Sequence, residues 1–83
     1  MAQWLEIESG DLVNIDQMQY ICIARSIGNN GKDVLRIRIY RDDVTHYVLT
    51  ENDSLEAAER NLARVKDYIA TGRTIIYYAY EKG

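Results

Sequence analysis

One amphipathic helix pattern limits what this chain can fold into more than any other feature. From Leu55 to Ile69, apolar residues recur at alternating steps of three and four, which aligns them on one side of a helix. The chain before residue 51 instead consists of short segments in which apolar and polar residues alternate, as they do in strands. A single helix therefore has to cover the sheet. The side chains expected on its buried side are Leu55, Ala58, Leu62, Val65 and Ile69.

Capping residues mark both ends of this helix, which we place at residues 53–71. Asp53 or Ser54 can accept hydrogen bonds from the free backbone N–H groups of the first turn, and Asp53 with Glu56 has the spacing of a capping box. Gly72 is well placed to end the helix in a left-handed conformation. The polar residues expected on the solvent side are Arg60, Asn61, Arg64 and Asp67.

Residues 1–50 predict four or five strands in meander order. Gly10 followed by Asp11 between two extended runs is typical of a tight hairpin turn, so the first two strands should pair. Asn29, Asn30 and Gly31 tolerate positive φ and mark the clearest loop. The strands are expected at residues 3–8, 11–15, 18–26, 34–40 and 44–50.

The fourth of these strands alternates most regularly. Leu35, Ile37 and Ile39 point to one face of the sheet, and Val34, Arg36, Arg38 and Tyr40 point to the other. The fifth strand is ambiguous, because it can bury either Thr45, Tyr47 and Leu49 or Val44, His46 and Val48.

Together these patterns predict one α+β domain, residues 1–83, in which a single antiparallel sheet carries the helix on one face. The opposite face is left open. Residues 73–81 predict a C-terminal strand with bulky apolar groups on both faces. That strand adds either to this chain's own sheet edge, beside the first strand, or to the edge of a neighbouring subunit.

Composition limits the class of protein. A chain of 83 residues buries only about 60 % of the surface that it exposes when unfolded, so subunit association is a natural supplement to its thin core. A net charge of -3 predicts no global attraction to nucleic acid or anionic lipid. The apolar runs are too short for a membrane helix, and no secretory signal is visible. The single cysteine, Cys22, fits a reducing cytoplasm.

No set of residues in the sequence has the spacing of a recognisable catalytic or metal-binding motif. The only histidine, His46, lies in a strand, and Cys22 lies between two isoleucines, as a small buried hydrophobe does. The acidic residues in turns and at the helix start have a structural role there, and the glycine-rich nucleotide-binding patterns are absent. We therefore predict no enzyme activity, no metal and no cofactor.

Arg36, Arg38 and Tyr40 share one face of a strand and suggest one kind of ligand. Arginines and aromatic rings on an open sheet can hold single-stranded nucleic acid, and Arg25 and the C-terminal tyrosines could extend such a surface. Alternatively, glutamates of the first strand, Glu6 and Glu8, neutralise these arginines, within the chain or across a dimer.

Two segments resemble a known family. The hairpin end GDLVNIDQMQYI and the strand-to-helix segment YVLTENDSLEAAERNLARVKDYI are similar to the corresponding parts of small bacterial proteins of the FlbD type. The resemblance implies a small non-enzymatic protein with a sheet and one helix. It transfers no functional residue to this chain.

Exposed aromatic residues lead to the main functional hypothesis. They are more numerous than a monomer with one covering helix can readily bury, and tyrosine and tryptophan dominate interface energetics. We therefore expect a homo-oligomer, with a dimer favoured, or binding to another protein, and no membrane partner. The expected interface residues are Trp4, Tyr40, Ile76, Tyr77, Tyr78 and Tyr80.

Overall fold

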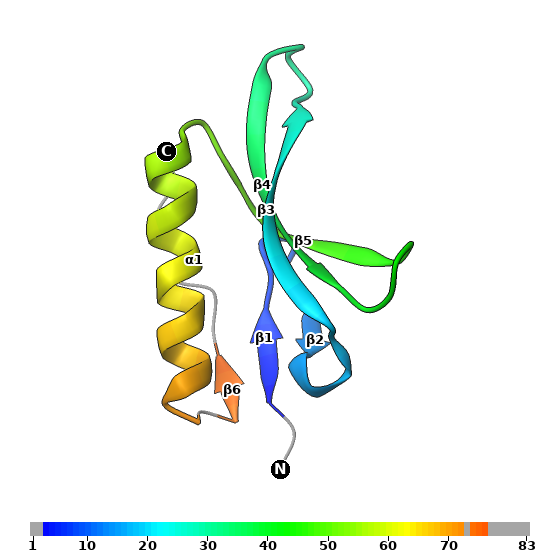
Figure 1. Ribbon diagram of the computed structural model, residues 1–83, viewed down its shortest axis with the longest axis vertical. Helices are drawn as coiled ribbons and strands as arrows, with labels where there is room; N and C mark the ends of the chain where they lie inside the picture. The colour runs from blue at the N-terminus through cyan, green and yellow to red at the C-terminus, as the bar shows by residue number, and fades with distance from the viewer. Residues whose placement is uncertain (1–2, 73, 77–83) are drawn as a thin grey trace.

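A computed structural model describes residues 3–72 and 74–76 and shows an α+β fold (Figure 1). In this part of the chain, one α-helix accompanies two sheets of three strands each. The elements, in chain order, are β1 (Trp4–Glu6), β2 (Leu12–Asn14), a short 3-10 helix (Ile15–Gln17), β3 (Tyr20–Ile27), β4 (Asp33–Tyr40), β5 (His46–Asn52), α1 (Leu55–Ala70) and β6 (Ile75–Ile76).

The prediction of a single meander sheet is wrong, because the chain turns away after β2 instead of continuing into β3. The Asn14 side chain accepts a hydrogen bond from the backbone N–H of Asp16, which caps the 3-10 helix at this turn. β1 pairs antiparallel with β2 and parallel with β6, in the order β2-β1-β6. The second sheet is an antiparallel meander in the order β3-β4-β5.

The predicted hairpin turn is present and also connects the two sheets. Gly10 has φ of 93°, and the N–H of Ile7 donates to the C=O of Asp11 at 2.9 Å. Just after β1, the N–H of Glu8 donates to the C=O of Leu49 in β5 at 2.8 Å. The Glu8 carboxylate accepts from the N–H of Glu51 at 2.9 Å, so the end of this hairpin is fastened to β5.

Apolar residues from both sheets and the helix form one core. Ile37 and Ile39 of β4 are fully buried, as their alternation predicted. In β5, Leu49 is fully buried whereas Val44, just before the strand, is 85 % exposed, which settles the ambiguity in favour of the face with Leu49. The buried core residues are Leu5, Ile7, Val13, Ile37, Ile39, Leu49, Val65 and Ile76.

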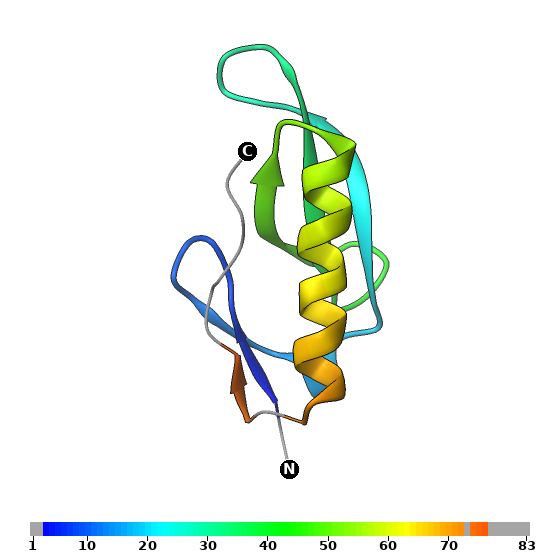
Figure 2. The same ribbon diagram turned by 90° about the vertical axis from the view of Figure 1, so that its left-hand side faces the viewer.

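α1 lies against the inner side of the β3-β4-β5 sheet, and its buried side includes the predicted Ala58, Leu62, Val65 and Ile69 but not Leu55 (Figure 2). Leu55 is 54 % exposed, whereas Ala57 and Asn61 are buried. The prediction that Asn61 faces solvent is therefore wrong. Its Nδ2 donates to Oδ1 of Asn52, at the end of β5, over 2.6 Å, and this bond satisfies polar groups that burial would otherwise leave without a partner.

The caps of α1 follow the sequence. Ser54 is the N-cap, and its hydroxyl accepts from the N–H of Ala57 at 3.2 Å, which resolves the choice between Asp53 and Ser54. Gly72 has φ of 72°, the left-handed conformation expected after a helix.

β6 contains the described part of the C-terminal strand. Ile75 and Ile76 pair in parallel with Trp4 and Leu5 of β1, and the N–H of Trp4 donates to the C=O of Thr74 at 2.8 Å. This segment therefore adds to the chain's own sheet. Of the predicted strand 73–81, residue 73 and residues 77–81 lie outside the described residues.

The buried bond between Asn52 and Asn61 leads to a stability prediction. Asn61→Ala removes the donor and leaves Oδ1 of Asn52 buried without it, so we expect the free energy of unfolding to fall by about 1–3 kcal/mol. Urea unfolding measures the change, with Glu59→Ala on the exposed side of α1 as the matched control. Equal effects of the two substitutions would contradict the assigned role of Asn61.

Candidate functional site

The side of the β3-β4-β5 sheet that faces away from α1, called the outer face below, carries the residues singled out for binding. The strand register arranges them in rows across the three strands. The first row has a ring on each of the three strands. Each of the next two rows contains one arginine of β4. The rows are Tyr20, Tyr40 and His46, then Cys22, Arg38 and Val48, then Ala24, Arg36 and Glu51.

The aromatic row is a set of contacting rings. Tyr20 and Tyr40 stack with centroids 4.6 Å apart and planes 10° apart, and Tyr40 meets His46 at 5.0 Å. Tyr20 remains 46 % exposed. Partial desolvation raises the pKa of Tyr20 above 10.0, and charge interactions with Tyr40, Cys22 and Asp43 add to this shift. Sequence reasoning missed Tyr20, which only the pairing of β3 with β4 brings beside Tyr40.

The structure places Arg36 and Arg38 beside Tyr40, as predicted, but with partners inside the chain. Nε of Arg36 lies 3.0 Å from Oε2 of Glu51, and its Nη1 donates to the hydroxyl of Ser26. Arg38 donates from Nη1 to the Tyr40 hydroxyl at 3.3 Å, and its Nε is buried with no hydrogen-bond partner among the described residues. Internal pairing leaves less of these cations available to a phosphate.

The glutamate that pairs with the outer face differs from the two that were predicted. Glu51, directly across from Arg36 in the register, forms the ion pair, whereas Glu8 accepts from the backbone of Glu51. Arg25 does not join the outer face, because it alternates with Ala24 and lies in a hollow beside the start of α1 with Asp33 and Asp53.

The outer edge of β3 is the longest unpaired edge in the described part of the chain. β3 has eight residues and ends the sheet order on one side, since β4 is its single partner among the described strands. Figure 2 shows this strand along one flank of the molecule, beyond the helix. Its side chains are apolar or small on both faces, and Arg25 is its single charged residue.

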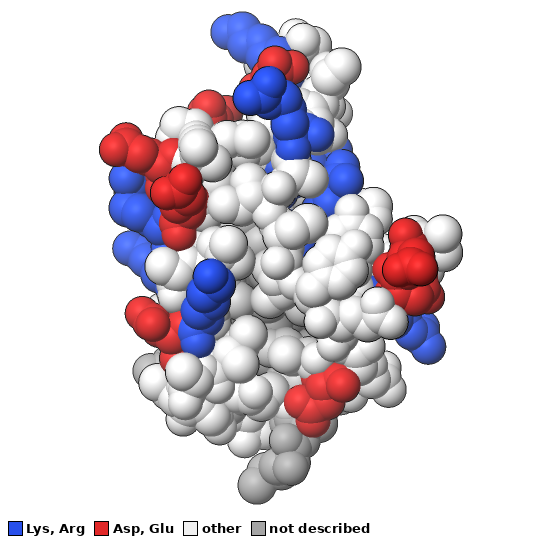
Figure 3. All heavy atoms as spheres, viewed as in Figure 1, with Lys and Arg blue, Asp and Glu red and all other residues white. Residues whose placement is uncertain are grey.

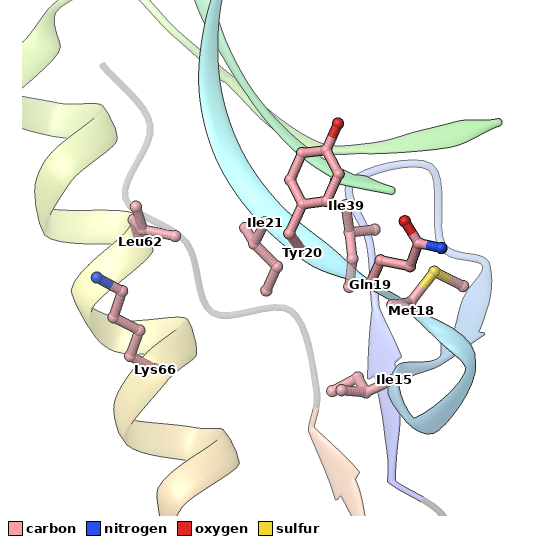
Figure 4. A pocket seen from close by; sticks show the side chains of 8 residues that line it. All are labelled: Ile15, Met18, Gln19, Tyr20, Ile21, Ile39, Leu62 and Lys66. Carbon is pink, nitrogen blue, oxygen red and sulfur yellow. The ribbon is translucent and has the colours of Figure 1, made fainter. Parts of the chain in front are cut away.

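A groove adjoins this edge between β3 and α1 (Figure 4). It has a volume of about 300 Å³, and the sticks in Figure 4 show side chains from α1, β3, β4 and the preceding turn around it. Figure 3 shows that charged groups on this side of the molecule lie mainly around an uncharged central band. The lining residues are Ile15, Met18, Gln19, Tyr20, Ile21, Ile39, Leu62 and Lys66.

The remaining predicted interface residues lie elsewhere. Trp4 is partly exposed and lines a second hollow of about 400 Å³ together with Tyr47 and Arg41. Ile76 is 1 % exposed and belongs to the core, so its side chain is not on the surface. Three tyrosines of the predicted interface lie outside the described residues; they are Tyr77, Tyr78 and Tyr80.

Reactive and metal-binding side chains do not gather on these surfaces. Cys22 is a free, half-buried thiol in the row of Arg38, and His46 contacts the Tyr40 ring. In residues 3–72 and 74–76, no three His, Cys, Asp or Glu side chains are placed so that they could hold a metal ion. In the same residues, no helix combines the length and the hydropathy needed to cross a membrane.

Comparisons with protein-family models, with curated proteins and with solved structures found no match to this chain.

The turn between β4 and β5 positions one end of the outer face and leads to a pH prediction. The Asp42 carboxylate accepts from the N–H groups of Val44 and Thr45 at 2.9 and 2.7 Å, and these bonds hold the pKa of Asp42 below 3.8. Because folding lowers this pKa, the Asp42 carboxylate stabilises the fold at pH values above its pKa in the unfolded chain. This stability is lost as the pH falls through its pKa in the folded protein.

Asp42→Asn keeps an oxygen acceptor but removes the charge. We expect the variant to unfold at lower urea concentration than the parent at pH 7, and the difference to shrink as the pH falls below 3.8. Urea midpoints at pH 7 and pH 2.5 measure it. A difference that stays constant between the two pH values would contradict the role of the carboxylate.

Proposed function

We propose that this chain is a non-enzymatic interaction protein that self-associates through the side of the molecule formed by the β3 edge, the outer face and the groove beside α1. The single observation that carries the proposal is the outer edge of β3, which pairs with no described strand and has eight residues and one charge. A cytoplasmic setting and the FlbD-type resemblance remain predictions beside it.

An unprotected edge of this length is unusual in a protein that stays monomeric. Its backbone N–H and C=O groups form a template for another strand, and monomeric proteins block such edges with short strands, lysine, proline or bulges. β3 contains neither lysine nor proline, and its pairing with β4 continues without a register shift. These features favour strand addition as the mode of association.

The surfaces next to the edge supply the area that an interface needs. A stable interface covers at least about 600 Å² on each partner. Eight strand residues extend over about 27 Å, so a strip roughly 10 Å deep supplies only about 270 Å². The exposed ring of Tyr20 and the apolar groove beside Ile21 can supply the remainder, and tyrosine is a favoured interface residue.

Arg25 offers a test, because its side chain is exposed and the β3–β4 register directs its N–H to the outer edge. Arg25→Pro removes that N–H and places a ring on the edge, so we expect the dimer dissociation constant to rise tenfold or more. Arg25→Ala, which retains the N–H, should leave the constant within about threefold of the parent. Sedimentation equilibrium at micromolar concentrations gives these constants, and circular dichroism checks the fold.

A parent chain that sediments as a 9.6 kDa monomer at every concentration would overturn the proposal. We propose that the C-terminal tyrosines also contribute to the interface. Replacing Tyr77, Tyr78 and Tyr80 by serine at the same time, in the full chain, tests this contribution. An unchanged dissociation constant would remove these three residues from the interface.

A second candidate function is binding of single-stranded nucleic acid at the outer face. The observation that favours it is the stacked pair of exposed Tyr20 and half-buried Tyr40 beside two guanidinium groups, since rings stack on bases and cations attract phosphates. The ion pair of Arg36 with Glu51 counts against it.

Salt dependence separates this candidate from the first. If the outer face binds a mixed oligonucleotide, affinity should fall steeply between 50 and 200 mM salt, and Arg36→Ala with Arg38→Ala should weaken binding at least tenfold. Fluorescence anisotropy measures both effects, with Arg60→Ala on α1 as a control that removes a cation elsewhere. No binding at 50 mM salt would exclude the candidate.

A further inference from the structure

We infer that the groove between β3 and α1 binds a small apolar carboxylate, with the hydrocarbon chain of the ligand in the groove and its carboxylate beside Lys66. The inference goes beyond self-association and does not depend on it, because the lining of the groove belongs to one copy of the chain. The groove has a volume of about 300 Å³, at the lower end of the range for small-molecule sites.

The position of α1 leaves one side of the core uncovered. The buried bond from Asn61 joins the helix to Asn52 in β5, the strand at the far side of the sheet from β3. Ile39 in the central strand is fully buried, whereas Ile21, its direct partner on β3, is only half-buried. The apolar core therefore reaches the surface along the inner side of β3.

Apolar side chains from three parts of the chain line the groove at this point (Figure 4). They come from the segment before β3, from β3 itself and from α1, and they are half-buried against the core. A hydrocarbon chain in the groove covers the apolar surface that they still expose, and removal of such surface from water favours binding. These residues are Ile15, Met18, Ile21 and Leu62.

Lys66 is the one charged residue among the described residues that line the groove. Its side chain is exposed, and no described residue forms an ion pair or a hydrogen bond with its ammonium group. A lysine keeps its charge in water while its stem packs on apolar surface, so this cation lies at the rim. It is complementary to one negative charge at the end of a hydrocarbon chain. A carboxylate fits better than a phosphate, which has more charge than one ammonium group neutralises.

Equilibrium dialysis of the full chain against decanoate tests the inference. We expect saturable binding of one decanoate per chain. Octanoate is two methylene groups shorter and should bind about tenfold more weakly, because each buried methylene group adds to the free energy of binding. Decanol has the same hydrocarbon chain without the charge, so it should also bind more weakly than decanoate.

Substitutions at the rim and in the wall of the groove separate the two parts of the ligand. Lys66→Gln removes the cation and should weaken decanoate binding about fivefold, the upper end for an exposed ion pair, without changing decanol binding. Lys66→Arg should restore decanoate binding. Leu62→Ala should weaken decanoate and decanol equally, with circular dichroism as a check of the fold. Lys32→Gln, in the exposed loop between β3 and β4, is the matched control and should change neither affinity.

Because the proposed dimer covers the groove, each measurement is repeated with Arg25→Pro, a substitution outside the lining, at a concentration at which light scattering shows a monomer. Uptake of decanoate that does not saturate, or equal effects of Lys66→Gln and Lys32→Gln, overturns the inference. No binding to the parent or to Arg25→Pro overturns it too, and leaves self-association standing. Saturable binding to a parent chain that is monomeric at every concentration supports the inference and overturns the proposed function.

Discussion

The buried hydrogen bond between Asn61 and Asn52 joins the helix to the sheet and orients one against the other. Nδ2 of Asn61 reaches Oδ1 of Asn52 inside the protein, and Nδ2 of Asn52 in turn donates to the backbone of Leu35. A buried amide has to find partners, so this chain of bonds favours one rotation of α1 against the strands. The small side chains Ala57 and Ala58 then face the sheet, where they permit close approach.

With α1 fixed in this way, the topology decides which strand edges stay open. β1 is occupied on both sides by β2 and β6, and β4 lies between β3 and β5. Glu8 occupies the outer edge of β5, because its N–H donates to the C=O of Leu49 and its carboxylate accepts from the N–H of Glu51. β3 is the long strand whose outer edge no described residue bonds. The surface proposed for association therefore contains the one long strand edge whose backbone groups have no partner among the described residues.

Local features of the fold were predictable because their causes are local. Glycine at positive φ set the turn at Gly10 and the helix end at Gly72, and the alternation in β4 correctly predicted the burial of Ile37 and Ile39. The period of apolar residues could not predict that Asn61 is buried, because a hydrogen bond to Asn52 on β5 stabilises its burial. Nor was the split into two sheets, which depends on a turn at Asn14 that a pattern of alternating residues does not reveal. The outer face was recovered in part: Arg36, Arg38 and Tyr40 share it, but Tyr20 and Glu51 join them only through pairing.

The sequence by itself determined the types of element, their approximate ends and the alternation of side chains along each strand, because these follow from backbone conformation and from the period of apolar residues. The tertiary structure decided which strands are neighbours, which polar groups are buried together and which edge remains free. Those outcomes depend on hydrogen bonds between residues of different elements, such as Glu8 with Leu49 and Asn61 with Asn52. Neither partner in such a bond carries a sequence signal for the other, so the free edge of β3 became evident only from the folded arrangement.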